Sequence, residues 1–435
     1  MTSVIAIIGT LDTKGAELLY LREQIDKRGK TPILIDVSCK PHRYEMSKAD
    51  VTCYQVAEAA GSTMSKVSVS ARRDAASVMA QGASLIVQKL YRDNKLHGII
   101  GLGGSVGTEI ATKAMRALPL GTPKLCISTM RNTAPYVGTK DVMMLYPVVD
   151  LAGGPNLNRV ERKVLTNAAN AITGMVEGEV PGGEDKPLVA ASMIGITTPC
   201  VQAAKLILEA RGYEVVVFHA NGAGGLALEE VVRSGSVVGV LDATTHELAD
   251  ELVGGVGSAG PKRLEAAAEA GIPQVLCPGG LELAMFHTLD TIPSKFRRRH
   301  FFRHSESYTL MRLTRNEITR LGGTMADKVD KEAAAPIAVV LPVKGWSAYD
   351  HVDGPFCCNS SGETTSFKWY DPRTSDAFLA GLQKRLDTSR QNLEVLKVEA
   401  HINDPEFASV VAQILIEMLE GKWKNRNIES LRSSA

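Results

Sequence analysis

The sequence predicts an α/β protein with two Rossmann-like, doubly wound domains, each built on a parallel sheet. Short apolar, β-branched runs alternate with longer segments of helical period, which is typical of α/β architecture. Several runs end in glycine-rich turns, as strand-to-helix connections often do. Residues 177–186 are polar and rich in glycine and proline. They predict a linker between domains at 1–180 and 187–425.

In the first half, Val4–Ile8 is a short, branched apolar run and is expected to form a buried strand. Segment 41–70 is polar and is expected to be irregular. Further strands are expected at Pro32–Val37, Gly98–Leu102, Lys124–Ser128 and Val142–Pro147. Helices are expected at Glu17–Arg28, 71–94, 108–118 and Asn158–Met175.

After the linker the alternating pattern restarts, which predicts the second domain. Strands are expected at Leu188–Gly195, Glu214–His219, Val237–Asp242, Gln274–Cys277, Ile337–Leu341 and Leu393–His401. Helices are expected at Pro199–Arg211, Gly225–Ser234, 246–252, 262–270, 308–321 and Pro405–Leu419.

The composition is that of a soluble globular chain of 435 residues, with 44% hydrophobic and 22% charged residues. The net charge of +1 provides no global field for nucleic acid or an anionic membrane. No apolar run reaches the roughly 18 residues of a membrane helix, and the first residues do not resemble a signal peptide. The seven scattered cysteines predict reduced thiols. We therefore expect a cytoplasmic protein.

The segment after the first strand is a candidate phosphate-binding turn. It contains Gly9, Thr10, Asp12, Thr13 and Lys14, but not the spacing of a P-loop. Hydroxyls and backbone N–H groups at the start of a helix bind phosphate, and the lysine adds positive charge. The alternative is that Asp12 or Thr13 only caps the helix and Lys14 is solvated.

A second glycine-rich turn follows the strand at 98–102 and predicts a shared nucleotide crevice with the first turn. Its glycines allow close approach of a phosphate, and its hydroxyls can donate hydrogen bonds. The alternative is a tight helix-packing turn. Asp36 ends a strand and is a candidate for ribose hydroxyls or for a local cap, and Thr129 is expected at the same rim. The candidates in the turn are Gly103, Gly104, Ser105, Gly107 and Thr108.

Strand-end turns in the second half predict a second polar crevice, for a small organic substrate. The basic run 297–304 is expected to anchor a carboxylate or phosphate, or else to form a solvated charged face. Two of its histidines stand four residues apart, but without an evident third ligand we expect no metal site. The candidates are Asn221, Gly224, Asp242, His246, Glu282, Arg298, His300, His304 and His401.

Together the motifs resemble one family: GTLDTKGAE (9–17), GGSVGT (103–108), HANGAGG (219–225), DATTHELADELVGG (242–255), RRRHFFRH (297–304) and HINDPEF (401–407). It is the ATP-binding family that includes the amino-terminal region of the tomato mosaic virus resistance protein and many bacterial relatives. The resemblance covers about residues 1–425. It implies two Rossmann-like subdomains, self-association into a homo-oligomer and ATP binding. Because the plant relative continues into a phosphoenolpyruvate-hydrolase-like barrel, such a barrel protein is a candidate partner in trans.

These observations lead to one functional expectation with an alternative. The first domain is expected to hold ATP with Mg²⁺, and the protein to be an ATP-dependent enzyme that acts on a small anionic metabolite between the two domains. The alternative is a non-catalytic, ATP-responsive protein-interaction module. A dinucleotide-dependent oxidoreductase is a weaker third interpretation, because no GxGxxG turn follows the first strand.

Overall fold

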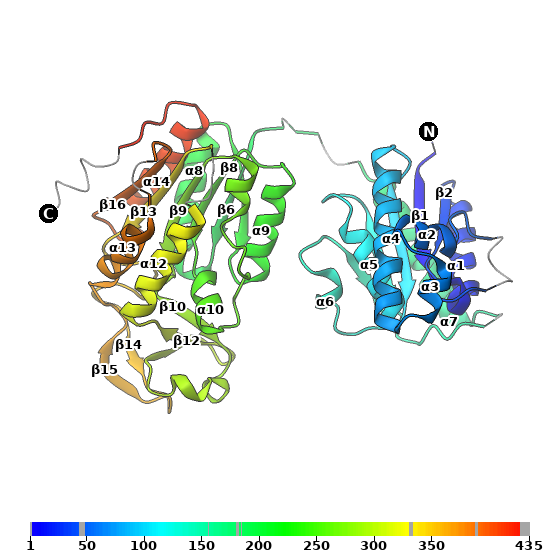
Figure 1. Ribbon diagram of the computed structural model, residues 1–435, viewed down its shortest axis with the longest axis horizontal. Helices are drawn as coiled ribbons and strands as arrows, with labels where there is room; N and C mark the ends of the chain where they lie inside the picture. Colours follow the sequence, from blue (N-terminus) through cyan, green and yellow to red (C-terminus); the bar gives the residue numbers. More distant parts are fainter. Residues whose placement is uncertain are drawn as a thin grey trace. The chain divides into compact units, whose positions relative to one another are not determined.

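The computed structural model describes residues 2–42, 48–154, 156–179, 182–183, 185–329, 334–387 and 390–426. The chain folds as two compact units, residues 1–183 (unit 1) and 184–435 (unit 2) (Figure 1). Residues 180, 181 and 184 of the expected linker lie outside the described part.

Unit 1 is built on a five-stranded sheet with the strand order β2-β1-β3-β4-β5. All four neighbouring pairs are parallel, which confirms the expected α/β class. The strands are β1 (Val4–Gly9), β2 (Thr31–Asp36), β3 (Gly98–Gly103), β4 (Lys124–Ser128) and β5 (Met143–Leu145).

Helices cover both faces of this sheet, which is why its strands are apolar throughout. Ala6 and Ile8 of β1 pack with residues of α2, α4 and α5, whereas Ile5 and Ile7 pack with α1 and α7 on the opposite face. The helices are α1 (Leu11–Asp26), α2 (Cys53–Ala59), α3 (Met64–Val69), α4 (Arg72–Arg92), α5 (Ser105–Arg116), α6 (Ala134–Val137) and α7 (Arg159–Glu177).

The expectation that segment 41–70 is irregular is wrong for part of it, because α2 and α3 lie there. Residues 43–47 are outside the described part. At seven and six residues, the two helices are too short to display a clear period. One sequence signal for α2 is the capping box at its start. The Thr52 side chain accepts from the Gln55 amide, and the Gln55 side chain accepts from the Thr52 amide.

Unit 2 contains a six-stranded, fully parallel sheet with the order β16-β13-β9-β8-β6-β7. Its core packs α8 and α14 on one face, and α10, α12 and α13 on the other. The strands are β6 (Leu188–Met193), β7 (Glu214–His219), β8 (Gly239–Thr244), β9 (Gln274–Gly279), β13 (Ile337–Pro342) and β16 (Leu393–Val398). The helices are α8 (Thr198–Ala210), α9 (Ala223–Arg233), α10 (Glu247–Val253), α11 (Ala266–Ala270), α12 (Arg315–Val329), α13 (Thr374–Arg385) and α14 (Pro405–Leu419).

Unit 2 also carries a small antiparallel sheet that the sequence did not predict, with the order β10-β12-β11-β14-β15. The expected helix at 308–321 is corrected here, because its first part is strand β12. Leu310 and Met311 fit a helical period, but pairing with β10 and β11 determines their structure. The strands are β10 (Leu283–Phe286), β11 (Phe301–Arg303), β12 (Thr309–Arg312), β14 (Phe356–Cys358) and β15 (Thr364–Lys368).

Two further features bear on the class of protein. Among the described residues, no helix combines the length and the apolar character that crossing a membrane requires. All seven cysteines lie in the described part and are free thiols.

The same substitution, glycine to alanine, at two helix positions of unit 1 tests how α4 packs on α2. A Cβ at Gly82 in α4 would stand 1.9 Å from the carbonyl oxygen of Val56 in α2. The substitution G82A should therefore destabilise unit 1 by about 1–3 kcal/mol, since the helices must separate. At Gly174 in α7, nothing lies within 4 Å of an added Cβ. G174A should stabilise by about 0.5–1 kcal/mol through helix propensity. Thermal unfolding followed by circular dichroism measures both; a G82A protein that melts at or above the wild-type temperature contradicts the packing.

Candidate functional site

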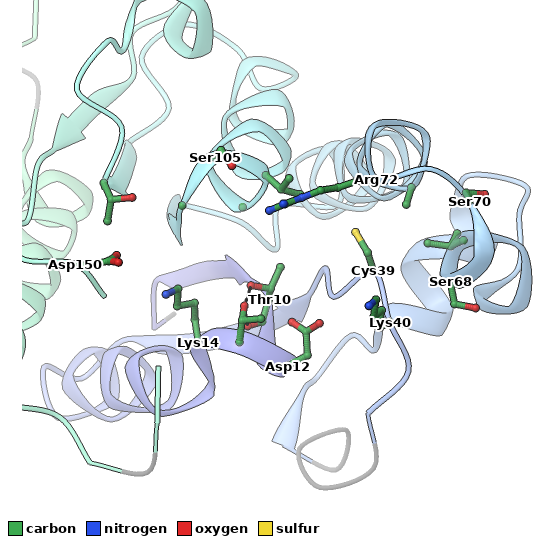
Figure 2. Close-up of a pocket in the computed structure, with 17 residues that line it drawn as sticks. Thr10, Asp12, Lys14, Cys39, Lys40, Ser68, Ser70, Arg72, Ser105 and Asp150 are labelled. Carbon is green, nitrogen blue, oxygen red and sulfur yellow. Dashed lines mark hydrogen bonds between the residues drawn. The ribbon is translucent and has the colours of Figure 1, made fainter. Parts of the chain in front are cut away.

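A pocket of about 690 Å³ lies where the loops after β1 and β3 meet (Figure 2). In the sheet order, β1 stands between β2 and β3, so the chain moves to one side of β1 and then returns to the other. Such a topological switch point is where open α/β sheets bind ligands, outside the carboxyl ends of the strands. The lining residues are Thr10, Asp12, Thr13, Lys14, Cys39, Lys40, Val67, Ser68, Ser70, Arg72, Ala75, Gly104, Ser105, Val106, Gly107, Thr129 and Asp150.

The fold brings the two predicted turns together at this pocket. The predicted residues that line it are Thr10, Asp12, Thr13, Lys14, Gly104, Ser105, Gly107 and Thr129. The predicted residues that are not part of its lining are Gly9, Asp36, Gly103 and Thr108. Contact of any of these residues with a nucleotide stays a prediction.

Three residues at the amino terminus of α5 line the pocket and have amides without a partner among the described residues. Gly104 is the N-cap and has no side chain to cap the helix. Within the described residues, the amides of Ser105, Val106 and Gly107 donate no hydrogen bond, and all three residues line the pocket. Unsatisfied amides at the positive end of a helix dipole form an anion-binding site.

The turn after β1 differs from the start of α5, because its amides have partners within the protein; phosphate binding by this turn stays a prediction. The Leu11 amide donates to Asp36 Oδ1 at 3.2 Å, and the Asp12 amide donates to Ser38 Oγ at 3.1 Å. The next two amides donate to the carbonyl oxygen of Thr10. The hydroxyls of Thr10 and Thr13, 2.6 Å apart, remain at the pocket surface with Lys14.

Asp36 is fully buried and has partners within unit 1, so its binding to ribose hydroxyls stays a prediction. Its Oδ1 atom accepts from the Leu11 amide and from both the amide and the hydroxyl of Ser38. Its Oδ2 atom lies 2.8 Å from Nε2 of His42. Asp36 thus orders the turns behind the pocket wall and has no oxygen directed into the pocket.

Gly103 and Thr108 also build the frame of the site. A Cβ at Gly103 would come within 2.6 Å of the Gly107 backbone, so only glycine permits this turn. The Thr108 hydroxyl is buried and lies 2.7 Å from Ser128 Oγ and 3.2 Å from the carbonyl oxygen of Gly103. These contacts fix the amino terminus of α5 against β3 and β4.

Three cations surround the pocket: Lys14 from α1, Lys40 from the loop after β2, and Arg72 from α4. Figure 2 shows the Arg72 side chain reaching toward the turn that carries Ser105. In the described part of the chain, none of the three cations forms an ion pair. Unpaired cations around unsatisfied amides favour a negatively charged ligand.

Arg72 and Lys40 are not among the residues predicted from the sequence, although one signal indicated Arg72. Arg72 and Arg73 open α4, and positive charge at a helix amino terminus opposes the helix dipole. Such a placement does not stabilise the helix. The other lining residues that we did not select are Cys39, Val67, Ser68, Ser70, Ala75, Val106 and Asp150.

Asp12 and Asp150 are the two carboxylates of the lining. Partial desolvation raises the pKa of Asp12, and the neighbouring charge of Asp36 raises it further, while the hydrogen bond from Ser38 opposes both. A carboxylate placed near a polyphosphate site is a ligand of the type that Mg²⁺ prefers.

In unit 2, Asp242 belongs to a buried ion-pair network centred on Arg263. The guanidinium donates to both oxygens of Asp242, to Glu247 Oε2 at 2.6 Å and to Glu229 Oε1 at 3.3 Å. All four side chains are at most 5% exposed. Asp242 also accepts from the Ser192 hydroxyl at 2.6 Å. It therefore has internal partners instead of lining an open crevice.

His246, Glu282 and His401 also contact other parts of unit 2. His246 is fully buried; burial alone would lower its pKa, but the adjacent Asp250 and Glu247 carboxylates outweigh it and raise the pKa. Glu282 Oε1 accepts from the Ser347 hydroxyl, and His401 Nε2 lies 3.0 Å from the Ser347 carbonyl oxygen. Contact of these side chains with a substrate stays a prediction.

The histidines of the basic run flank strand β11 and do not lie on a helix, so the four-residue spacing does not bring them together. Along an extended strand, four residues span about 13 Å. The His300 ring stacks on Phe367 at 4.2 Å between centroids, and His304 Nδ1 lies 2.8 Å from the Tyr349 hydroxyl. Arg298 is exposed.

The turn between β7 and α9 holds the two remaining candidates. Asn221 is exposed, and its side-chain oxygen accepts from the Gly224 amide at 3.4 Å. A Cβ at Gly224 would meet the His219 carbonyl oxygen at 1.8 Å, so this glycine permits the tight turn.

Comparison with known proteins assigns the chain to a family. The amino-terminal domain of the uncharacterised protein family UPF0261 matches residues 3–181, and its carboxyl-terminal domain matches residues 186–419. The chain belongs to the UPF0261 family. Its relatives include a UPF0261 protein of Clostridium tetani, 41% identical over 97% of this chain and 100% of the relative. The ToMV resistance protein Tm-1 of Solanum lycopersicum is 35% identical over 97% of this chain and 56% of the relative.

The resemblance drawn from the motifs is thus confirmed at the level of the family, with tomato and bacterial relatives. The chain spans little more than half of the tomato protein's length. Among solved structures, a UDP-N-acetylglucosamine 2-epimerase matches 63% of this chain and 79% of its own, with 10% identity and a TM-score of 0.22. A likeness of this size carries no argument about function.

The network in unit 2 can be tested by removing its cation. R263M removes the arginine shared by three buried carboxylates, leaves Asp242 and Glu247 without their ion-pair partner, and should destabilise unit 2 by about 3–5 kcal/mol. The matched control is R233M, which removes a 36% exposed arginine paired with Glu229 and Glu269 and should cost less than about 1 kcal/mol. Urea unfolding followed by tryptophan fluorescence reports on unit 2, because all three tryptophans lie there. Equal losses in the two variants would show that Arg263 is not the centre of the network.

Proposed function

We propose that unit 1 binds ATP as its magnesium complex in the pocket at the β1–β3 switch point. The observation that carries this proposal is the convergence of three unsatisfied amides of α5 with three unpaired cations on one cavity, within the described residues. The amides would bind the oxygens of a phosphate group, and Lys14, Lys40 and Arg72 would neutralise the rest of the polyphosphate charge.

The size and lining of the pocket also support a nucleotide. Its volume of about 690 Å³ lies within the range of small-molecule sites. Besides the charged groups, Val67, Ala75 and Val106 contribute apolar surface to the lining. A ligand with an apolar base at one end and a polyphosphate at the other would use both kinds of surface.

Asp12 and Asp150 are the side chains that would hold Mg²⁺, since both are carboxylates of the lining. Bound magnesium neutralises developing charge on phosphate oxygens. In this arrangement the amides and cations position the polyphosphate, while Thr10 and Thr13 supply hydroxyl donors at its edge.

We further propose that the protein is an ATP-dependent enzyme that acts on a small anionic metabolite. Exposed basic side chains of unit 2, among them Arg298, would attract such a substrate. The alternative is a non-catalytic, ATP-responsive interaction module. A phosphoenolpyruvate-hydrolase-like barrel protein is the partner proposed for the chain in either case. Release of ADP in the presence of a carboxylate library favours the enzyme; binding without turnover favours the module.

The cations should act on the phosphates. K14A and R72A should each weaken ATP binding roughly 10- to 100-fold, because a hydrogen bond to a charged group contributes about 1.5–3 kcal/mol. R73A is the matched control: Arg73 is the exposed neighbour of Arg72 on α4 and does not line the pocket. Calorimetry with ATP, ADP and AMP should show affinity falling in that order in the wild type. If R72A and R73A bind ATP equally well, the cation assignment is wrong.

A second variant should block the pocket without unfolding the protein. A Cβ at Gly104 meets only Thr129 Oγ1, at 3.9 Å, and the backbone there is extended. G104L should therefore fold normally while its side chain obstructs the amides of α5. We expect the loss of measurable ATP binding by calorimetry with an unchanged circular dichroism spectrum. Undiminished affinity in the folded variant would refute the site.

A further inference from the structure

A carboxylate, an imidazole and a thiol, three kinds of side chain that can bind a metal ion, lie close together in unit 1. Asp36 ends β2, His42 lies in the loop that follows, and Cys53 begins α2. Each offers one ligand atom, and these atoms lie within 4.8 Å of one another. Asp36 and Cys53 are fully buried, and the His42 side chain is 14% exposed. We propose that Asp36, His42 and Cys53 form a zinc site.

The two carboxylate oxygens of Asp36 have different partners. Oδ1 accepts from the Leu11 amide and from the Ser38 amide and hydroxyl. Oδ2 is hydrogen-bonded to Nε2 of His42 at 2.8 Å, and a bound zinc ion would replace this contact. Supporting hydrogen bonds that fix a ligand's orientation in this way are typical of protein metal sites.

The charges of the three side chains would balance a zinc ion. Zinc binding would displace the thiol proton, since Cys coordinates as the thiolate. Zn²⁺ with one thiolate, one carboxylate and a neutral imidazole has no net charge. A neutral assembly suits a site whose protein ligands are almost completely buried.

The ligand chemistry selects zinc rather than the Mg²⁺ that accompanies ATP. Mg²⁺ takes oxygen ligands, whereas sulfur, nitrogen and carboxylate oxygen together suit Zn²⁺. Bonds of about 2.0–2.3 Å place tetrahedral ligand atoms roughly 3.5 Å apart, so a small contraction of the cluster completes the site. Three protein ligands leave the fourth position for water. The proposal stands independently of nucleotide binding.

Zinc titration of the reduced, chelator-treated full chain, without nucleotide, tests the stoichiometry. In competition with a chromophoric chelator, we expect one tight Zn²⁺ per chain. H42Q and C53S should weaken it by more than about 100-fold, since even loss of a supporting group costs about 10- to 100-fold. C126S is the control, because Cys126 is a buried cysteine of β4 in the same unit and outside the cluster. No zinc uptake by the wild type, or equal affinity in H42Q and wild type, overturns the site.

Cobalt substitution identifies the sulfur ligand directly. Co²⁺ should give a thiolate-to-cobalt charge-transfer band and intense tetrahedral visible bands in the wild type and in C126S. C53S, checked for folding by circular dichroism, should lack the charge-transfer band. Cys39 is the other cysteine near Asp36. Loss of the band in C39S and its retention in C53S would assign the wrong cysteine and overturn the proposal.

Discussion

The parallel register of β1 and β3 is the constraint on which the candidate site of unit 1 depends. Ile8 pairs with Gly101, so the two strands end at the same edge of the sheet. The loop after β1 and the loop after β3 therefore begin side by side, although they lie far apart in the chain. With β2 on the other side of β1, the helices diverge above this edge and leave space between the loops.

Two kinds of residue make that space a candidate anion site. Gly103 brings the α5 backbone close to its strand, and the resulting helix start has no side-chain cap. Asp36 meanwhile accepts a hydrogen bond from the amide of Leu11, so this amide at the start of α1 has a partner within the protein. An amide with an internal partner is typical of a structural helix start, as in α1. Amides without a partner, as in α5, are available to a ligand.

Unit 2 repeats the strand order around its first strand but uses the corresponding position differently. There β6 stands between β7 and β8, and the polar side chains at the strand ends bond one another. Arg263 neutralises Asp242 near the end of β8, and this pairing leaves Asp242 buried. Similar topology thus supports a pocket in one unit and an ion-pair network in the other.

This difference also shows what could be predicted from the sequence. The alternation of strands and helices and the two glycine turns of unit 1 were readable, because apolar period and glycine position are local properties. An acid after a strand looks the same whether it faces a ligand pocket, as Asp12 does, or an arginine, as Asp242 does. Arg72 joins turns that lie far from it in the chain, and the Asp36–His42–Cys53 cluster depends on how the loop after β2 folds back on the start of α2. Neither arrangement corresponds to a known motif spacing.

A crystal structure of the full chain with Mg-ATP tests the central claim most directly. The account predicts that a phosphate oxygen lies within hydrogen-bond distance of the amides of Ser105, Val106 and Gly107, with the Arg72 guanidinium against the polyphosphate. Nucleotide bound elsewhere, with these amides facing solvent at saturating ATP, would contradict it.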